Sequence, residues 1–117
     1  MIRQFISFII VSALLIACSK NVVTGRSQFK LLPESELQTM AATQYQQFLS
    51  TNKVVTSSMN RDLDMVRRAG QRITNAVTNY YASKGIANQL AGYKWEYNLV
   101  DDKTVNAWCM PGGKIVV

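Results

Sequence analysis

Few side chains in this sequence could do chemistry. The 117 residues contain two cysteines, Cys18 and Cys109, and no histidine. Structural zinc sites use four cysteine or histidine ligands, and catalytic sites use three protein ligands that include histidine. Two cysteines without histidine supply neither set, so these residues alone are predicted to bind no metal. Nucleophiles activated by histidine, of the Ser-His or Cys-His type, are excluded for the same reason. The sequence therefore predicts no catalytic residue within residues 1–117.

Two further features could be mistaken for reactive sites. Asp101 and Asp102 are adjacent carboxylates, but neighbouring residues on a strand point to opposite faces. A turn is therefore predicted here rather than a metal or acid–base pair. Cys109 lies in an apolar stretch and is predicted to be a small buried side chain rather than a reactive thiol.

The N-terminus has the pattern of an export signal. Arg3 precedes a mostly apolar run over residues 5–17, which fits a secretory signal peptide. The run is shorter than the roughly 20 residues that a spanning helix needs, although a short anchor that stays attached is the alternative. The string "LIAC" ending at Cys18 resembles a bacterial lipobox.

That resemblance implies cleavage before Cys18, which makes residues 1–17 a lipoprotein signal peptide, and acylation of Cys18, with palmitate among the expected chains. Several acyl chains at about 0.8 kcal/mol per buried CH₂ would hold the protein on a membrane. Ser19, rather than an aspartate, favours the outer membrane of the bacterial cell envelope, facing the periplasm.

The net positive charge raises the question of whether the chain binds nucleic acid. Residues 18–117 hold 12 of the 13 basic residues and all seven acidic ones, a net charge of +5. A basic chain can bind nucleic acid, but a solvated basic helix face explains the scattered bases better. No RNP-type motif or helix-turn-helix spacing is present, so nucleic acid is not an expected partner.

The elements that follow are predicted from periodicity. Residues 18–33 are predicted to be a tether, because they are polar at first and interrupted by Gly25 and Pro33. Apolar residues at steps of three and four predict a first amphipathic helix over residues 34–51. Asn60 is predicted to cap a second helix that runs to Lys84 and stops at Gly85. The buried stripe of this second helix is predicted to comprise Leu63, Val66, Gly70, Ile73, Val77 and Tyr80 or Tyr81.

After Gly85 the period becomes two. The alternation over residues 93–100 predicts a half-buried strand, residues 101–104 a turn, and residues 105–110 and 114–117 two further strands joined by Pro-Gly-Gly. The predicted fold class is α+β: a signal peptide and tether, two helices, then a small antiparallel strand meander.

The closing string "NAWCMPGGKIVV", from Asn106 to Val117, resembles one known segment. It is similar to the strand-turn-strand of the zinc metallopeptidases of family forty-eight, the HtpX-like, CAAX-prenyl-protease-like and BepA-like gluzincins. Their pattern is Asn-Ala-aromatic-small-x-Pro-Gly-Gly-x-Ile-x-Val. The lipobox and the two helices match the general layout of the lipoprotein members, but only the last dozen residues are specific.

The resemblance implies that residues 34–117 are the N-terminal part of a zincin-like metallopeptidase domain. Asn106 and Ala107 would bind an extended peptide, or a misfolded envelope protein, by strand addition. The family's His-Glu-x-x-His helix, which binds zinc and supplies the base, is not within residues 1–117. The chain is therefore expected to be a fragment that ends before the zinc site of the full-length enzyme.

Two functions remain open from the sequence. The first is the N-terminal portion of a membrane-anchored zinc metalloendopeptidase that hydrolyses envelope proteins and is inactive as these 117 residues. The alternative is a non-catalytic short lipoprotein that binds or scaffolds peptide or protein partners. A plain core hairpin, with Pro111 and the glycines serving only the turn, is the structural reading of the same string.

Overall fold

The computed structural model describes residues 18–117, with side chains from residue 19 onward. The chain divides into two compact units after Pro33. The described part of the first unit is an antiparallel hairpin of β1 (Cys18–Lys20) and β2 (Ser27–Phe29), and the signal peptide predicted over residues 1–17 lies outside the described residues. The segment predicted to be a tether therefore contains regular structure.

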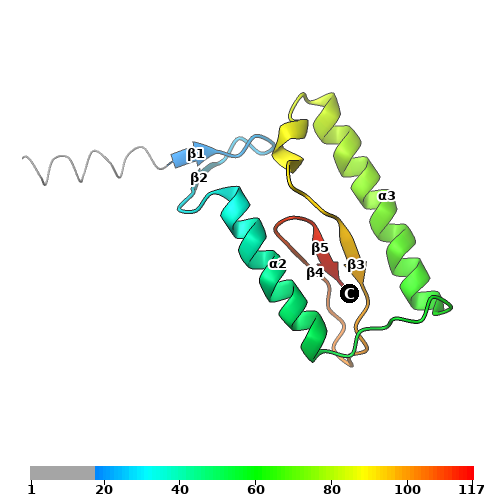
Figure 1. Cartoon of the computed structure of the whole chain (residues 1–117). Helices are drawn as coiled ribbons and strands as arrows, with labels where there is room; N and C mark the ends of the chain where they lie inside the picture. Colours follow the sequence, from blue (N-terminus) through cyan, green and yellow to red (C-terminus); the bar gives the residue numbers. More distant parts are fainter. Residues whose placement is uncertain (1–17) are drawn as a thin grey trace, which may run out of the picture. The chain divides into compact units, whose positions relative to one another are not determined.

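The second unit is α+β, as predicted (Figure 1). Its elements in chain order are α2 (Glu34–Thr51), α3 (Arg61–Ser83), the short 3₁₀ helix η1 (Ala87–Leu90), β3 (Glu96–Asn98), β4 (Trp108–Met110) and β5 (Lys114–Val116). The predicted bounds of the first helix are confirmed. The second helix is also confirmed: the Asn60 side chain accepts hydrogen bonds from two first-turn amides, and Gly85 follows the cap with a φ of 69°.

The prediction of a plain antiparallel meander is wrong. The strand order is β3-β5-β4, so β5 lies in the centre. It pairs in parallel with β3, with Tyr97 opposite Ile115, and antiparallel with β4, with Cys109 opposite Ile115. The chain leaves β3 and crosses to the far edge of the sheet to form β4. It then returns through the Pro-Gly-Gly turn and forms β5 between β3 and β4. Alternation identifies strands but not the order in which they pair.

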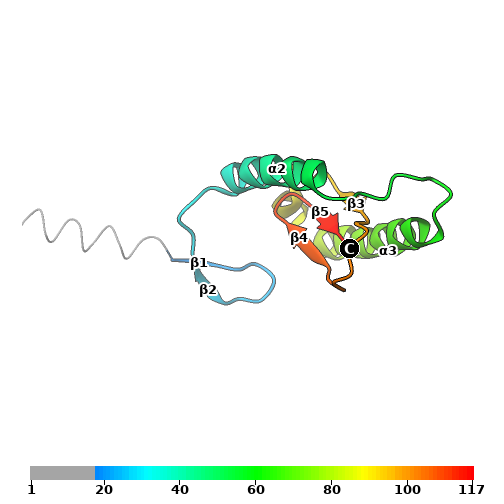
Figure 2. The same cartoon turned by 90° about the horizontal axis from the view of Figure 1, so that it is seen from below.

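The two helices cover opposite faces of this sheet. α2 packs on β4 and β5, and α3 packs on β3 and η1; Figure 2 shows the strands between them. Alternate residues of each strand therefore face different helices. The fully buried side chains among the described residues are Tyr45 of α2 and Leu63 of α3.

Close packing on both faces depends on glycines. A Cβ atom at Gly70 would lie 2.3 Å from a ring carbon of Tyr97, and one at Gly113 would lie 2.7 Å from a ring carbon of Trp95. Gly70 lies on the predicted stripe of α3, but Ile73 does not lie in the core: it is 63% exposed, and Thr74 is buried instead. Thr74 is buried because its hydroxyl forms a hydrogen bond with the Tyr97 hydroxyl. The absence of a side chain at Gly70 allows the Tyr97 ring to lie this close to α3.

Candidate functional site

β4 forms one edge of the three-stranded sheet. Its one strand partner among the described residues is β5, with Trp108 opposite Val116 and Met110 opposite Lys114. The outer side of β4 therefore carries backbone groups that no described strand pairs. An edge of this kind can accept an additional strand from another chain.

Asn106 and Ala107 lie immediately before β4, and both are exposed. The Asn106 side-chain oxygen accepts a hydrogen bond from the Ala107 amide at 2.8 Å. The Asn106 side chain therefore already pairs with the Ala107 backbone amide at the start of the edge. An extended peptide that paired here would have to displace this local bond or bind beside it.

These two residues border different hollows. Asn106 lines a small pocket of about 160 Å³ on the α2 side of the strand, together with Phe48 and Trp108. Ala107 lines a larger groove of about 530 Å³ on the α3 side. Asn106 and Ala107 are therefore adjacent at the start of the edge, but they line pockets on opposite faces of the sheet.

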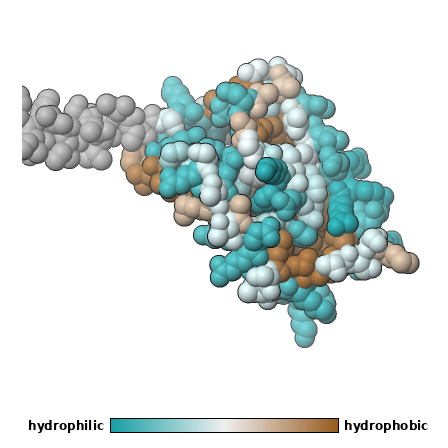
Figure 3. All heavy atoms as spheres, in the orientation of Figure 1, coloured by the Kyte–Doolittle hydropathy of each residue, from teal (hydrophilic) through white to brown (hydrophobic). Residues whose placement is uncertain are grey.

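The larger groove lies between α3 and the sheet, and its lining is almost entirely apolar. From the helix come Met65, Ala69 and Ile73, and from the sheet Leu99, Ile115 and Val117. Met65 and Ile73 are 50% and 63% exposed. Figure 3 shows apolar surface among hydrophilic residues toward the lower end of the view. The sequence missed this second apolar stripe, although Met65, Ala69 and Ile73 recur at four-residue steps.

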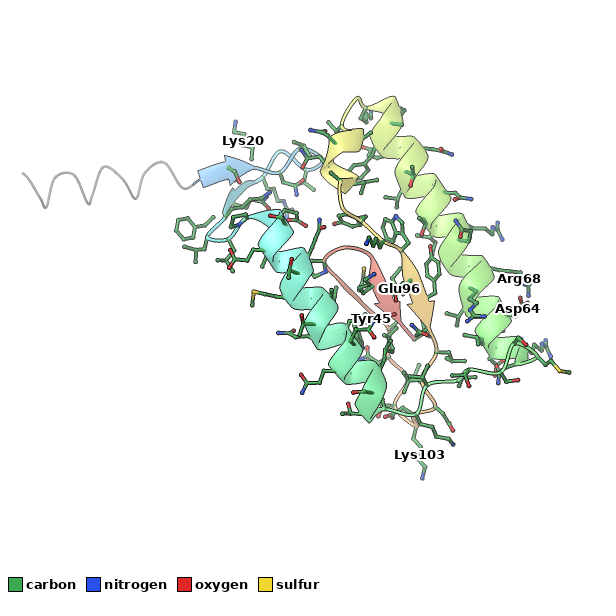
Figure 4. The ribbon with its side chains drawn as sticks, in the orientation of Figure 1. Lys20, Tyr45, Asp64, Arg68, Glu96 and Lys103 are labelled. Carbon is green, nitrogen blue, oxygen red and sulfur yellow. The ribbon has the colours of Figure 1, made fainter. Side chains whose placement is uncertain are left out.

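The opposite face of the sheet is closed by a polar network that the sequence also missed. Lys114 is 7% exposed; its ammonium group pairs with the Glu96 carboxylate and donates to the Lys94 carbonyl at 2.7 Å. Glu96 and Lys114 are opposite each other in the β3–β5 register. Figure 4 shows Glu96 and Tyr45 over the strands of the sheet, to the right of α2. The register could have revealed the pair, had the strand order been known.

Tyr45 joins the same network from α2. The Asn98 side-chain amide donates to its hydroxyl at 2.6 Å, and the Lys114 nitrogen lies 6.0 Å from the centre of its ring. Burial raises the pKa of Tyr45, against the opposing effect of the Asn98 hydrogen bond. Trp108, which is half-buried, packs edge-on against Phe48, with ring centres 5.0 Å apart.

The other reactive candidates have structural explanations. Asp102 accepts a hydrogen bond from the Thr104 amide at 2.7 Å, and this bond lowers the pKa of its carboxyl group. Asp101 forms an exposed ion pair with Lys53 at 2.5 Å. Both lie in the irregular connection between β3 and β4, where the chain bends at residues 103 and 104. Cys109 is exposed, so the prediction that it is buried is wrong: its strand face lies where α3 leaves β4 uncovered. Neighbouring protein atoms still raise the pKa of its thiol.

Comparisons with protein-family models, with curated proteins and with solved structures gave no match. Within residues 18–117, no helix has the length and apolar character needed to cross a membrane. The same residues contain no group of three histidine, cysteine or acidic side chains placed to hold a metal ion.

Proposed function

We propose that residues 34–117 are the peptide-binding, N-terminal part of a membrane-anchored zinc metalloendopeptidase, attached to the bacterial cell envelope through acylated Cys18. The observation that carries the proposal is the outer edge of β4, which no described strand pairs and which follows Asn106 and Ala107 beside an apolar groove. The resemblance of residues 106–117 to the gluzincin segment of family forty-eight supports the same assignment.

The edge and the groove suit an extended peptide of a misfolded envelope protein. Main-chain hydrogen bonds along β4 would hold such a peptide in a sequence-independent way, while alternate side chains would enter the groove and the small pocket. Asn106 would exchange its bond to Ala107 for bonds to the peptide. These residues bind and orient; bond cleavage is not assigned to any of them.

The residues present do not fit a zinc site, because the chain has no histidine. The proposal therefore assigns the zinc ligands to a segment beyond Val117. In a longer form of the protein we expect His-Glu-x-x-His on a helix within roughly 15–35 residues of Val117. A longer reading frame without this motif would favour the alternative, a non-catalytic lipoprotein that binds or scaffolds partners through the same edge.

Strand addition can be tested with an extended apolar peptide and its copy N-methylated at alternate residues. We expect N-methylation to weaken binding, because it removes main-chain donors. Asn106→Ala should weaken binding of the unmodified peptide about 2- to 13-fold, the effect of one neutral hydrogen bond worth about 0.5–1.5 kcal/mol. Fluorescence anisotropy measures both effects.

Trp108→Ala should mainly lower the stability of the fold, but Trp108 also lines the small pocket. The control variant is therefore Thr78→Ala, at an exposed position of α3 outside both hollows, which should leave the affinity unchanged. Unchanged affinity of Asn106→Ala, or equal binding of both peptides, would show that the Asn106 segment is a plain hairpin. In a zinc-loaded longer form, Asn106→Ala should lower peptide hydrolysis by the same factor without changing zinc content.

A further inference from the structure

The hairpin of β1 and β2 has a connection that is fixed by its own hydrogen bonds. The Asn21 amide donates to the Arg26 carbonyl, and the Gly25 amide donates to the Asn21 carbonyl, each at 2.8 Å. The Asn21 side chain accepts from the amides of Val23 and Thr24, each at 2.9 Å. Much of the polar backbone at the tip is thus paired, which lowers the cost of placing it in a less polar environment.

The side chains of this segment are unusually apolar for an exposed hairpin. Five large apolar residues are exposed between residues 22 and 32: Val22 by 53%, Val23 by 42%, Phe29 by 54%, Leu31 by 77% and Leu32 by 39%. Figure 3 shows apolar side chains over this end of the described chain. Two of them form the tip, and Phe29 lies opposite Cys18 in the strand register. A concentration of this kind marks an interaction surface.

The charges of the hairpin have a single sign. Residues 18–33 contain Lys20, Arg26 and Lys30 and no acidic residue. Lys20 and Arg26 flank the two valines of the tip, and Figure 4 shows Lys20 projecting from β1. Apolar side chains flanked by basic ones are the combination that binds an anionic bilayer, where each Lys or Arg adds about 1 kcal/mol near the surface.

We propose that the hairpin, residues 19–32, docks on an anionic lipid bilayer, with Val22 and Val23 inserted at the boundary between headgroups and acyl chains. Lys20, Arg26 and Lys30 then contact lipid phosphates. A bilayer is favoured over a protein partner because the apolar run of residues 5–17 ends directly before the hairpin. If that run is retained, or is cleaved before an acylated Cys18, residue 18 starts at the membrane.

This contact goes beyond the proposed peptidase function and does not depend on acylation. The tip is five residues from Cys18, which is at most about 17 Å of extended chain. An acyl group and a basic apolar hairpin are two membrane signals, and two such signals are what stable anchoring requires. The predicted tether is then itself a membrane-binding element.

The test uses the full chain in a Cys18→Ser, Cys109→Ser background, so that acylation plays no part. An environment-sensitive fluorophore is attached through Val23→Cys or, as a control, through Ser83→Cys at the exposed end of α3. The chain is mixed with phosphatidylglycerol-containing vesicles or with phosphatidylcholine vesicles. We expect a blue-shifted emission, quenched by nitroxide lipids, for the probe at position 23 on the anionic vesicles only.

Charge variants sharpen the result. Replacing Lys20, Arg26 and Lys30 by glutamine should lower the ratio of inserted to uninserted probe roughly fivefold for each residue replaced. The matched control replaces Arg61, Arg67 and Arg72, three exposed basic residues of α3, and should leave insertion unchanged. Circular dichroism checks that both triple variants keep their helices.

Three outcomes would overturn the proposal: water-like emission at position 23, equal insertion on both kinds of vesicle, or equal effects of the two triple variants. Acylation is read separately, by labelling the wild-type chain with a palmitate analogue in cells. Absence of labelling would reject the lipoprotein assignment and would not affect the conclusion drawn from the vesicles.

Discussion

The two faces of the sheet in residues 34–117 are built from the same three strands but are closed to different degrees. On the α2 face, Tyr45 is fully buried and Lys114 nearly so, and their polar atoms have partners. On the α3 face, the helix covers β3 and leaves an apolar groove beside β5 and the start of β4. The comparison shows that burial here follows the position of each helix over the strands rather than residue polarity: a lysine is buried while an isoleucine is exposed.

The closed face should be the more sensitive to substitution, and its ion pair gives the largest expected effect. Glu96→Ala leaves the buried Lys114 ammonium with the Lys94 carbonyl as its one remaining described partner, which should lower the free energy of unfolding by about 3 kcal/mol. Lys114→Met should cost less, because the Glu96 side chain is 42% exposed and can be hydrated. Urea unfolding of both variants measures the asymmetry. Equal losses would show that Lys114 reaches water.

On the α3 face, the close contact at Gly70 gives the next effect. Gly70→Ala places a methyl group against the Tyr97 ring, and such overpacking costs about 1–3 kcal/mol. In a Tyr97→Ala background the same substitution should instead stabilise the protein by about 1 kcal/mol, because alanine favours a helix over glycine. The thermal unfolding midpoints of the wild type, the two single variants and the double variant give this reversal of sign. Destabilisation in both backgrounds would mean that the contact does not limit packing.

Alkaline pH should weaken the closed face. The pKa of Tyr45 is raised above its ordinary value of 10.0 by burial, so the folded state keeps the phenol proton where the unfolded state has lost it. The resulting stability is fully present below about pH 10 and is lost as the pH rises through the folded-state pKa. Tyr45→Phe should cost about 1 kcal/mol at neutral pH, from the unpaired Asn98 amide, and should show a shallower loss above pH 10. Equal slopes for the two proteins would contradict burial of the phenol.

The same comparison explains what could be predicted from the sequence. The helix bounds follow from local signals, the Asn60 cap and Gly85, which act over a few residues. The burial of Thr74 and Lys114 could not be predicted, because it depends on Tyr97 and Glu96, which lie more than 15 residues away in sequence and meet them only in the observed strand order. Asn106 and Ala107 were predicted through a resemblance, but their placement beside different hollows follows from the edge position of β4.

The smallest effect on stability is expected at the open groove. Ile73→Lys replaces an exposed side chain, so the free energy of unfolding should change by less than about 0.5 kcal/mol. Its effect should appear in self-association, because the groove presents apolar surface next to a strand edge that no described strand pairs. We expect residues 18–117 to associate at rising concentration and Ile73→Lys to suppress this in sedimentation velocity.

Thr78→Lys is the matched control for that experiment. It adds the same charge at another exposed position of α3, about 140° around the helix from Ile73 at 100° per residue. If the groove drives association, the control should associate as the wild type does. Equal suppression by both lysines would identify net charge as the cause. Only a difference between the two positions assigns the association to the face that α3 leaves open.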